Sequence, residues 1–206
     1  MRPDRDRDRD PGGRPRNARP RDALGRPLDR AGPGAGAGAG LDAGSGQDRI
    51  PDDLLLAGPD AARLADELLR AGRPFHAHEV LEASWKFGPA QERDLWQGLA
   101  QIAVGLTHAH RGNARGAITL LGRGAQRVRT YQAQARDEDP AHQDSAHQDS
   151  AHQDSAHQES ADRDRPYGID LGAVLTAADD LAARIGRDGL AGIPAADLRP
   201  GLTPGR

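Results

Sequence analysis

The chain has 206 residues, and its 28 Lys and Arg residues against 31 Asp and Glu residues give a formal net charge of −3. This balance argues against a dedicated nucleic-acid-binding protein, because such proteins carry a clear excess of basic residues. The absence of cysteine excludes disulfides and thiolate chemistry. No segment is long and apolar enough for a signal peptide or a membrane span, so we expect a cytoplasmic protein without a membrane partner.

Two segments have the composition of disordered chain. Residues 1–50 contain no aromatic residue and are rich in Arg, Asp, Pro and Gly, so they cannot bury enough apolar surface to offset the entropy of ordering. Residues 132–165 are equally polar and include a five-residue repeat, AHQDS, whose period fits neither helix nor strand. The repeated histidines are compatible with weak metal binding, but we favour a surface linker, because gathering ligands from a flexible tract costs entropy.

The remaining sequence predicts an all-α fold. Apolar residues recur at the spacing of helices, and no segment shows the alternation of a strand. The expected helices cover residues 59–71, 75–87, 91–110, 113–131 and 170–187. We therefore expect one compact bundle of about five helices, formed by residues 51–131 and 166–190, with residues 191–206 as a flexible tail.

Several residues mark the ends and contacts of these helices. Gly112 and Asn113 are typical of a helix end followed by a new N-cap, and Asp170 is typical of an N-cap. Gly98 and Gly105 lie inside an expected helix, where glycine lowers helix propensity. Close approach of another backbone would explain both glycines.

The expected helix over residues 75–87 carries a polar pair between aromatic residues. Phe75, His78, Glu82 and Trp85 fall within an arc of about 80°. Because large aromatic side chains favour burial, we expect this stripe to face inward and to bury His78 and Glu82 in part.

The expected helix over residues 91–110 contains the longest uncharged run of the chain, so we place it at the centre of the bundle. Gln97, Gln101, Val104 and His108 form one line within an arc of about 60°. A short turn joins this helix to the preceding one, which makes the two an antiparallel hairpin. We expect their polar lines to face each other.

The facing polar side chains form the candidate site. Its members are His78, Glu79, Glu82, Gln97, Gln101 and His108. The leading hypothesis is that the site binds a small ligand or a divalent metal ion, with His78, Glu82 and His108 as the metal ligands. One alternative is a structural or protein-interaction module whose polar network only fixes helix packing. Another is a hydrolase that uses a His/Glu acid–base pair; a homo-oligomer is compatible with all three.

Other histidines and arginines have simpler interpretations. His76 and His78, like His108 and His110, are two residues apart, so the members of each pair point in nearly opposite directions on a helix. We therefore expect His76 and His110 at the surface. The arginines between residues 111 and 129 are compatible with a phosphate-binding patch, but we favour a solvated helix face.

The ordered pattern of these residues resembles a bacterial family, the domain-of-unknown-function family numbered 309. The matching positions are His78-Glu79-Val80-Leu81-Glu82, Trp85, Gln97-Gly98-Leu99, Gln101, Ala103, His108, Gly112-Asn113 and Gly116-Ala117. The segment HEVLE also resembles the zincin helix HExxH, but it has Glu82 where the second histidine belongs. The family resemblance covers residues 58–131 and implies a compact, all-helical domain of the bacterial cytoplasm, with no catalytic role to transfer. The chain departs from the family by its N-terminal extension and by the insert before residue 166.

Overall fold

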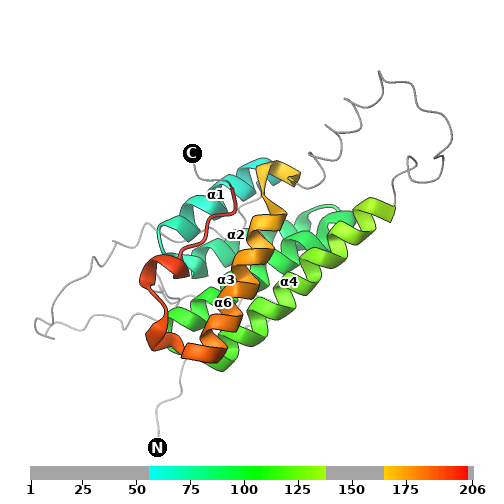
Figure 1. Ribbon diagram of the computed structural model, residues 1–206. Helices are drawn as coiled ribbons and strands as arrows, with labels where there is room; N and C mark the ends of the chain where they lie inside the picture. The colour runs from blue at the N-terminus through cyan, green and yellow to red at the C-terminus, as the bar shows by residue number, and fades with distance from the viewer. Residues whose placement is uncertain (1–55, 138–164, 204–206) are drawn as a thin grey trace, which may run out of the picture.

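The computed structural model describes residues 56–137 and 165–203 (Figure 1). The predictions of disorder for residues 1–50, and the interpretation of the AHQDS repeat, lie outside the described residues.

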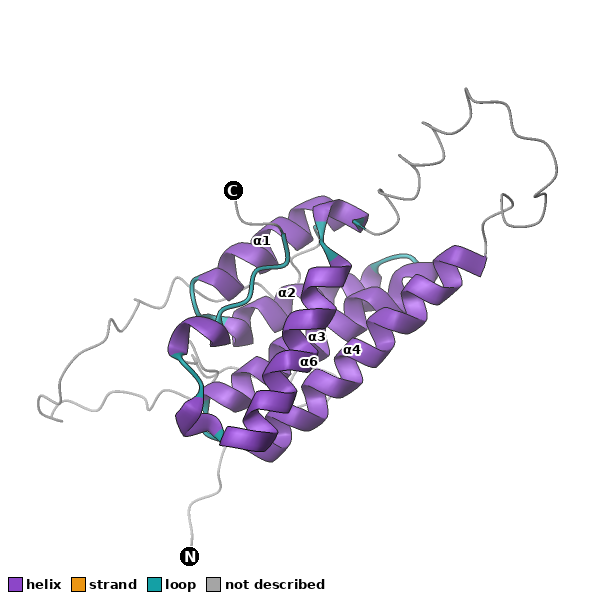
Figure 2. Cartoon of the chain, in the orientation of Figure 1, coloured by secondary structure: helices purple, strands orange, loops and turns teal. Residues whose placement is uncertain are grey.

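Helices make up all the regular structure of the described ranges, which contain no strand (Figure 2). The α-helices are α1 (Gly58–Arg70), α2 (Pro74–Phe87), α3 (Arg93–His110), α4 (Ala114–Asp137) and α6 (Leu171–Asp188). Short 3-10 turns lie between and after them: η1 (Ala90–Glu92), η4 (Pro166–Gly168), η5 (Leu190–Gly192) and η6 (Ala195–Leu198). The all-α class is confirmed.

Helix α3 lies at the centre of the bundle, as its uncharged run predicts. It packs most extensively on α4 and then on α2, while α6 packs on α4 and α1 packs on α2 (Figure 1). Its large apolar residues Leu95, Trp96, Leu99 and Leu106 are at most 1% exposed. Since burial of apolar surface is the main favourable contribution to folding, this helix holds the domain together.

Glycines allow α3 and α4 to approach closely. A Cβ atom on Gly98 would lie 2.9 Å from the backbone oxygen of Gly124, and one on Gly124 would lie 2.6 Å from the backbone oxygen of Gly98. Gly105 meets Leu121 in the same way, at 3.0 Å from its backbone nitrogen. The close approach expected at Gly98 and Gly105 is confirmed, and α4 is the partner.

Two ion pairs join α4 to its neighbours. Arg127 Nη1 lies 2.8 Å from Asp94 Oδ1 at the start of α3, and Arg129 pairs with Asp179 of α6. Arg127 and Arg129 therefore contact neighbouring helices, which the interpretation of the arginines as a solvated helix face did not predict.

The chain beyond α6 differs from the expected flexible tail. Ile193 and Leu202 are buried against the helices. The carboxylate of Asp66 in α1 accepts hydrogen bonds from the backbone nitrogens of Leu202, at 2.5 Å, and Thr203, at 3.2 Å. The described part of the tail is thus packed against α1. At the other boundary, α4 continues to Asp137, past the expected helix end at residue 131.

No helix in the described ranges combines the length and apolar character that crossing a membrane requires.

Candidate functional site

Helix α2 buries a different face from the one expected. Its buried side chains are Pro74, His76, Ala77, Val80 and Leu81. The aromatic and polar stripe predicted to face inward lies along the flank of the helix and is only half-buried. The expectation that His76 lies at the surface is wrong, because this residue is 5% exposed.

The polar pair of that stripe is assembled as the helical spacing predicts. His78 Nε2 lies 3.7 Å from Glu82 Oε2, and Lys86 Nζ lies 2.9 Å from Glu82 Oε1. The side chains of His78 and Glu82 are 24% and 33% exposed, so water reaches both. Burial lowers the pKa of His78 below its ordinary 6.5, while the charge of Glu82 opposes this shift and that of Lys86 adds to it. His78 is therefore neutral at pH 7.

The polar line of α3 is the one part of its central surface that reaches solvent. From Leu95 to Ala109, the half-buried positions are Gln97, Gln101, Val104 and His108, and every other residue is buried. Helices α2 and α3 run antiparallel from a short connection, and His78 and Gln101 lie almost equally far from it in sequence. We call the surface that carries His78, Glu82, Gln97 and Gln101 the α2–α3 seam, because these half-buried side chains lie on two helices that pack on each other.

Two atoms of the seam lack hydrogen bonds. Nδ1 of His78 and Oε1 of Gln101 are buried, and neither has a hydrogen-bond partner among the described residues. An unmet hydrogen bond at a buried polar atom costs about 1–3 kcal/mol, so two on adjacent helices are unusual. The described side chains thus leave the hydrogen-bonding capacity of these two atoms unused.

His108 belongs to a turn and is not joined to the other candidates. Its Nδ1 lies 2.8 Å from Nδ2 of Asn113, whose Oδ1 accepts a hydrogen bond from the backbone nitrogen of Gly116 at 2.9 Å. A Cβ atom on Gly116 would lie 2.6 Å from His108 Nδ1, so only glycine fits there without a shift. Gly112 has φ of +78°, the left-handed conformation typical of a helix C-cap. These residues shape the connection between α3 and α4.

The structure does not assemble the predicted metal ligands. Within residues 56–137 and 165–203, no three His, Cys, Asp or Glu side chains are grouped so that they could hold a metal ion. His78 and Glu82 are neighbours, whereas His108 is turned toward Asn113. Glu79 is half-buried and follows His78 directly, so it lies about 100° around α2 from that residue.

His110 is half-buried and does not lie free at the surface as expected. Its Nε2 lies 3.2 Å from the backbone oxygen of Leu198, and it thereby ties the end of α3 to η6. Burial lowers the pKa of His110 below 6.5; the hydrogen bond to Leu198 opposes this shift, and the charge of Arg199 adds to it.

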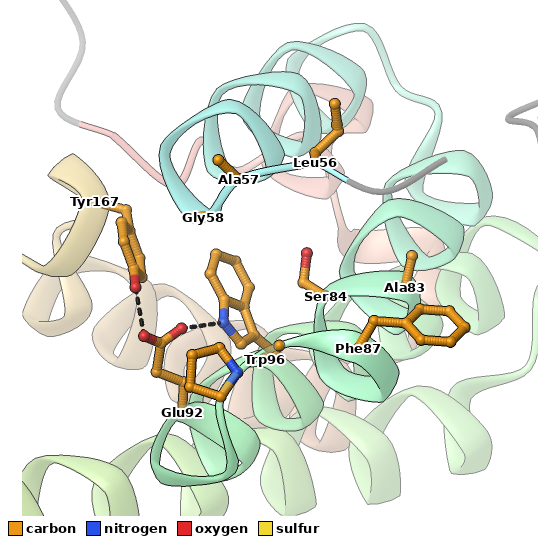
Figure 3. A pocket seen from close by; sticks show the side chains of 11 residues that line it. Leu56, Ala57, Gly58, Ala83, Ser84, Phe87, Glu92, Trp96 and Tyr167 are labelled. Atoms are coloured by element: carbon orange, nitrogen blue, oxygen red, sulfur yellow. Dashed lines mark hydrogen bonds between the residues drawn. The ribbon is translucent and has the colours of Figure 1, made fainter. Parts of the chain in front are cut away.

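A groove of about 320 Å³ lies on another side of α2, where α1 begins (Figure 3). Ala83, Ser84 and Phe87 of α2 line it together with Leu56, Ala57, Gly58, Gly88, Pro89, Glu92, Trp96 and Tyr167. The sequence interpretation missed this groove. The i, i+4 spacing of Glu92 and Trp96 was a local signal, but Tyr167 is 75 positions away from Glu92 in the chain.

One carboxylate connects the two aromatic residues of the groove. Oε2 of Glu92 accepts a hydrogen bond from Trp96 Nε1 at 2.7 Å, and Oε1 accepts one from the Tyr167 hydroxyl at 2.5 Å (Figure 3). The rings of Trp96 and Tyr167 are stacked, with centroids 5.4 Å apart and planes at 24°. Burial, followed by the hydrogen bond and charge of Glu92, raises the pKa of Tyr167 far above its ordinary 10, so the phenol stays protonated.

Comparisons with known proteins find one similar curated protein and one family. The curated "Uncharacterized protein YpuF" of Bacillus subtilis (strain 168) is 41% identical over 63 residues, which are 30% of this chain and 34% of that protein. The chain thus matches about a third of the length of this relative. No solved structure matches the chain.

The family match covers α1 from its sixth residue, α2, α3 and the start of α4. Residues 63–120 match the family described as "Domain of unknown function (DUF309)". This range includes all six residues of the candidate site and the turn at Asn113. Over residues 63–120 the chain is therefore similar to the DUF309 family.

Proposed function

We propose that the helical domain binds a small, polar organic molecule on the α2–α3 seam. The observation that carries this proposal is the pair of buried atoms without hydrogen-bond partners, His78 Nδ1 and Gln101 Oε1. Both lie beside side chains that water reaches, so a ligand can approach them from the surface. We also propose, from the sequence, that the protein acts in the cytoplasm.

The chemistry of the seam selects a ligand rich in hydrogen-bond donors. Oε1 of Gln101 is an acceptor. Nε2 of His78 is the ring nitrogen nearer the Glu82 carboxylate, at 3.7 Å, and a neutral ring protonated there has Nδ1 as a second acceptor. The Phe75 ring, whose centroid lies 6.2 Å from that of His78, adds an apolar wall. Ureas, amides, amines and polyols present donors of this kind.

The stability of two variants tests the proposal. Replacing His78 or Gln101 with leucine removes a buried polar atom that lacks a partner, so each variant should be more stable than the native protein, by about 1 kcal/mol. Gln97→Leu is the matched control, because it changes the same line of α3 at a residue with no such atom. Thermal unfolding monitored by circular dichroism measures all three.

Ligand screening by thermal shift tests binding directly. Ureas, amides, amines and polyols at millimolar concentration are compared on the native protein and on Gln101→Leu. We expect at least one class to raise the Tm of the native protein and to leave that of the variant unchanged. A destabilised Gln101→Leu variant, together with no class that distinguishes the two proteins, would contradict the proposal and favour the packing-only alternative.

The hydrolase alternative uses the same pair of residues in another role. His78 would act as a general base, held by Glu82, and Glu82 is itself paired with Lys86. This hypothesis predicts that the native protein hydrolyses a simple ester or phosphate substrate and that His78→Gln abolishes the activity. The binding proposal predicts no turnover by either protein.

A further inference from the structure

We propose that the groove between the start of α1 and the α2–α3 connection is a second binding site, for a small organic cation. The ligand would be a primary ammonium or guanidinium group on a short apolar stem. This site does not depend on the α2–α3 seam, because Ala83, Ser84 and Phe87 lie on a different arc of α2 from His78 and Glu82.

Among the described residues, the groove carries one negative charge that no basic side chain compensates. Glu92 is the only charged residue among those that line it. Both of its oxygens accept hydrogen bonds from neutral groups, the indole of Trp96 and the phenol of Tyr167. These donors fix the position of the carboxylate without neutralising it, and no basic side chain of the described residues forms an ion pair with Glu92. A carboxylate in partly apolar surroundings favours a cation, because electrostatic attraction is stronger there than in bulk water.

Apolar and aromatic side chains form the rest of the groove. Phe87 is 65% exposed at its edge, and Leu56 and Pro89 line it as well. These surfaces can contact the apolar stem of an ammonium or guanidinium compound, and aromatic rings also attract organic cations. The volume of about 320 Å³ is at the lower end of the range of ligand pockets, roughly 300–1,000 Å³, and therefore favours a small ligand.

The position of Tyr167 is fixed from several sides. Its φ of +58° is a left-handed conformation that bulky residues rarely adopt. Its ring stacks on Trp96, and a Cβ atom on Gly58 would lie 2.6 Å from that ring. Such backbone conformations persist only where the surrounding contacts enforce them. The Tyr167 hydroxyl, and with it the Glu92 carboxylate, is therefore held in place before a ligand arrives.

Nuclear magnetic resonance of the full chain provides a direct test. The sequence has two tryptophans, so the protein shows two indole N–H signals, and Trp85→Phe assigns them. The probes are 3-methylbutylammonium and butylguanidinium; the neutral and anionic controls of similar shape are 3-methylbutan-1-ol and 4-methylpentanoate. All four are titrated at constant ionic strength.

We expect both cations to shift the Trp96 signal in a saturable way, with an affinity at least tenfold higher than that of the alcohol. The carboxylate should cause no saturable shift. A difference between the two cations identifies which head group the site prefers. Equal responses to cation and alcohol, or a response confined to Trp85, would overturn the proposal.

Two variants place the binding in the groove. Glu92→Gln should weaken cation binding at least tenfold, and Phe87→Ala should weaken it less, through loss of contact with the stem. Glu67→Gln is the matched control, because its carboxylate is exposed on α1 and outside the groove. Unchanged affinity in Glu92→Gln would refute the assignment. If this variant does not fold, the comparison of cation and alcohol on the native protein decides, and Phe87→Ala, at an exposed position, confirms the location.

Discussion

Asp66 connects α1 to the C-terminal segment, and its replacement by alanine tests how strongly that segment is held. Its Oδ1 accepts hydrogen bonds from the backbone nitrogens of Leu202 and Thr203. Its Oδ2 accepts bonds from the Thr203 hydroxyl and from Nε of Arg70, both at 2.9 Å. Since Asp66 is 9% exposed, water cannot replace all of these bonds after the substitution.

The loss of stability expected for Asp66→Ala follows from the hydrogen-bond donors that lose their acceptor. The backbone N–H of Leu202, in a buried residue, would be left without a partner, at a cost of about 1–3 kcal/mol. The charged bond to Arg70 adds about 1–2 kcal/mol, because that side chain is partly exposed and water takes over some of its bonding. We expect a total near 3 kcal/mol, which lowers the Tm of a domain of this size by roughly 10 °C.

Calorimetry and chemical unfolding of the full chain measure this loss. Asp60→Ala is the matched control on the same helix, since the Asp60 side chain is 59% exposed and its partner among the described residues is Arg63, at 3.4 Å. The control should unfold like the native protein. If the Tm of Asp66→Ala falls by less than about 2 °C, or if the Tm falls equally in both variants, the reasoning is refuted.

The stabilisation by Asp66 should depend on pH in a definite direction. Burial alone would raise the pKa of Asp66, but hydrogen bonds from Arg70, Thr203 and Leu202 outweigh it and lower the pKa below the ordinary value of 3.8. A lowered pKa in the folded state means that the carboxylate stabilises the protein fully above the unfolded-state pKa and loses this effect as the pH falls through the folded-state pKa. The stability difference between native protein and Asp66→Asn should therefore be constant from pH 7 to 5 and shrink below about pH 4.

Three further predictions concern other parts of the domain. Gly124→Ala should lower the free energy of unfolding, measured with urea, by about 1–3 kcal/mol, because its Cβ would meet the backbone of α3. Gly122→Ala on the same helix is the control: it has open space around it and should be neutral or stabilising. Asn113→Ala should cost about 1–2 kcal/mol through loss of the N-cap of α4, measured by thermal unfolding, and no change would contradict the role of the turn. His78 should titrate below pH 6.5 by NMR, and Glu82→Gln should lower its pKa further, because the charge of Glu82 raises it. An unchanged pKa of His78 in Glu82→Gln would show that the two side chains do not interact.

Much of the helical framework was predictable because its signals are local. The uncharged run of α3 indicated a central helix, and its glycines indicated a close backbone contact. The N-cap role of Asp170 is confirmed, since Oδ1 accepts a hydrogen bond from the backbone nitrogen of Ala173 at 2.9 Å. Each of these predictions depends on residues within a few positions of one another, where helix geometry alone determines the outcome.

Helix α2 shows that the spacing of residues along a helix does not always predict which of its faces is buried. This helix has two arcs that can face a core, one aromatic, with Phe75 and Trp85, and one of smaller aliphatic side chains, with Ala77, Val80 and Leu81. The structure buries the aliphatic arc, and His76 is buried with it. Small side chains allow the helices to pack closely, and the aromatic side chains are left half-buried. The spacing of residues along α2 is the same for both choices, so only packing against neighbouring helices selects one.

The sequence by itself determined the all-α class, the five described α-helices to within a few residues at most ends, and the alignment of the polar residues along α2 and α3. Only the tertiary structure decided which of those residues meet, that the segment after α6 packs on Asp66, and that Tyr167 completes a groove with Glu92 and Trp96. The physical reason is the range of the interactions. Helix formation and capping depend on neighbours within one or two turns, whereas the seam, the C-terminal contact and the groove join segments far apart in the chain, which only the packing of the whole domain brings together.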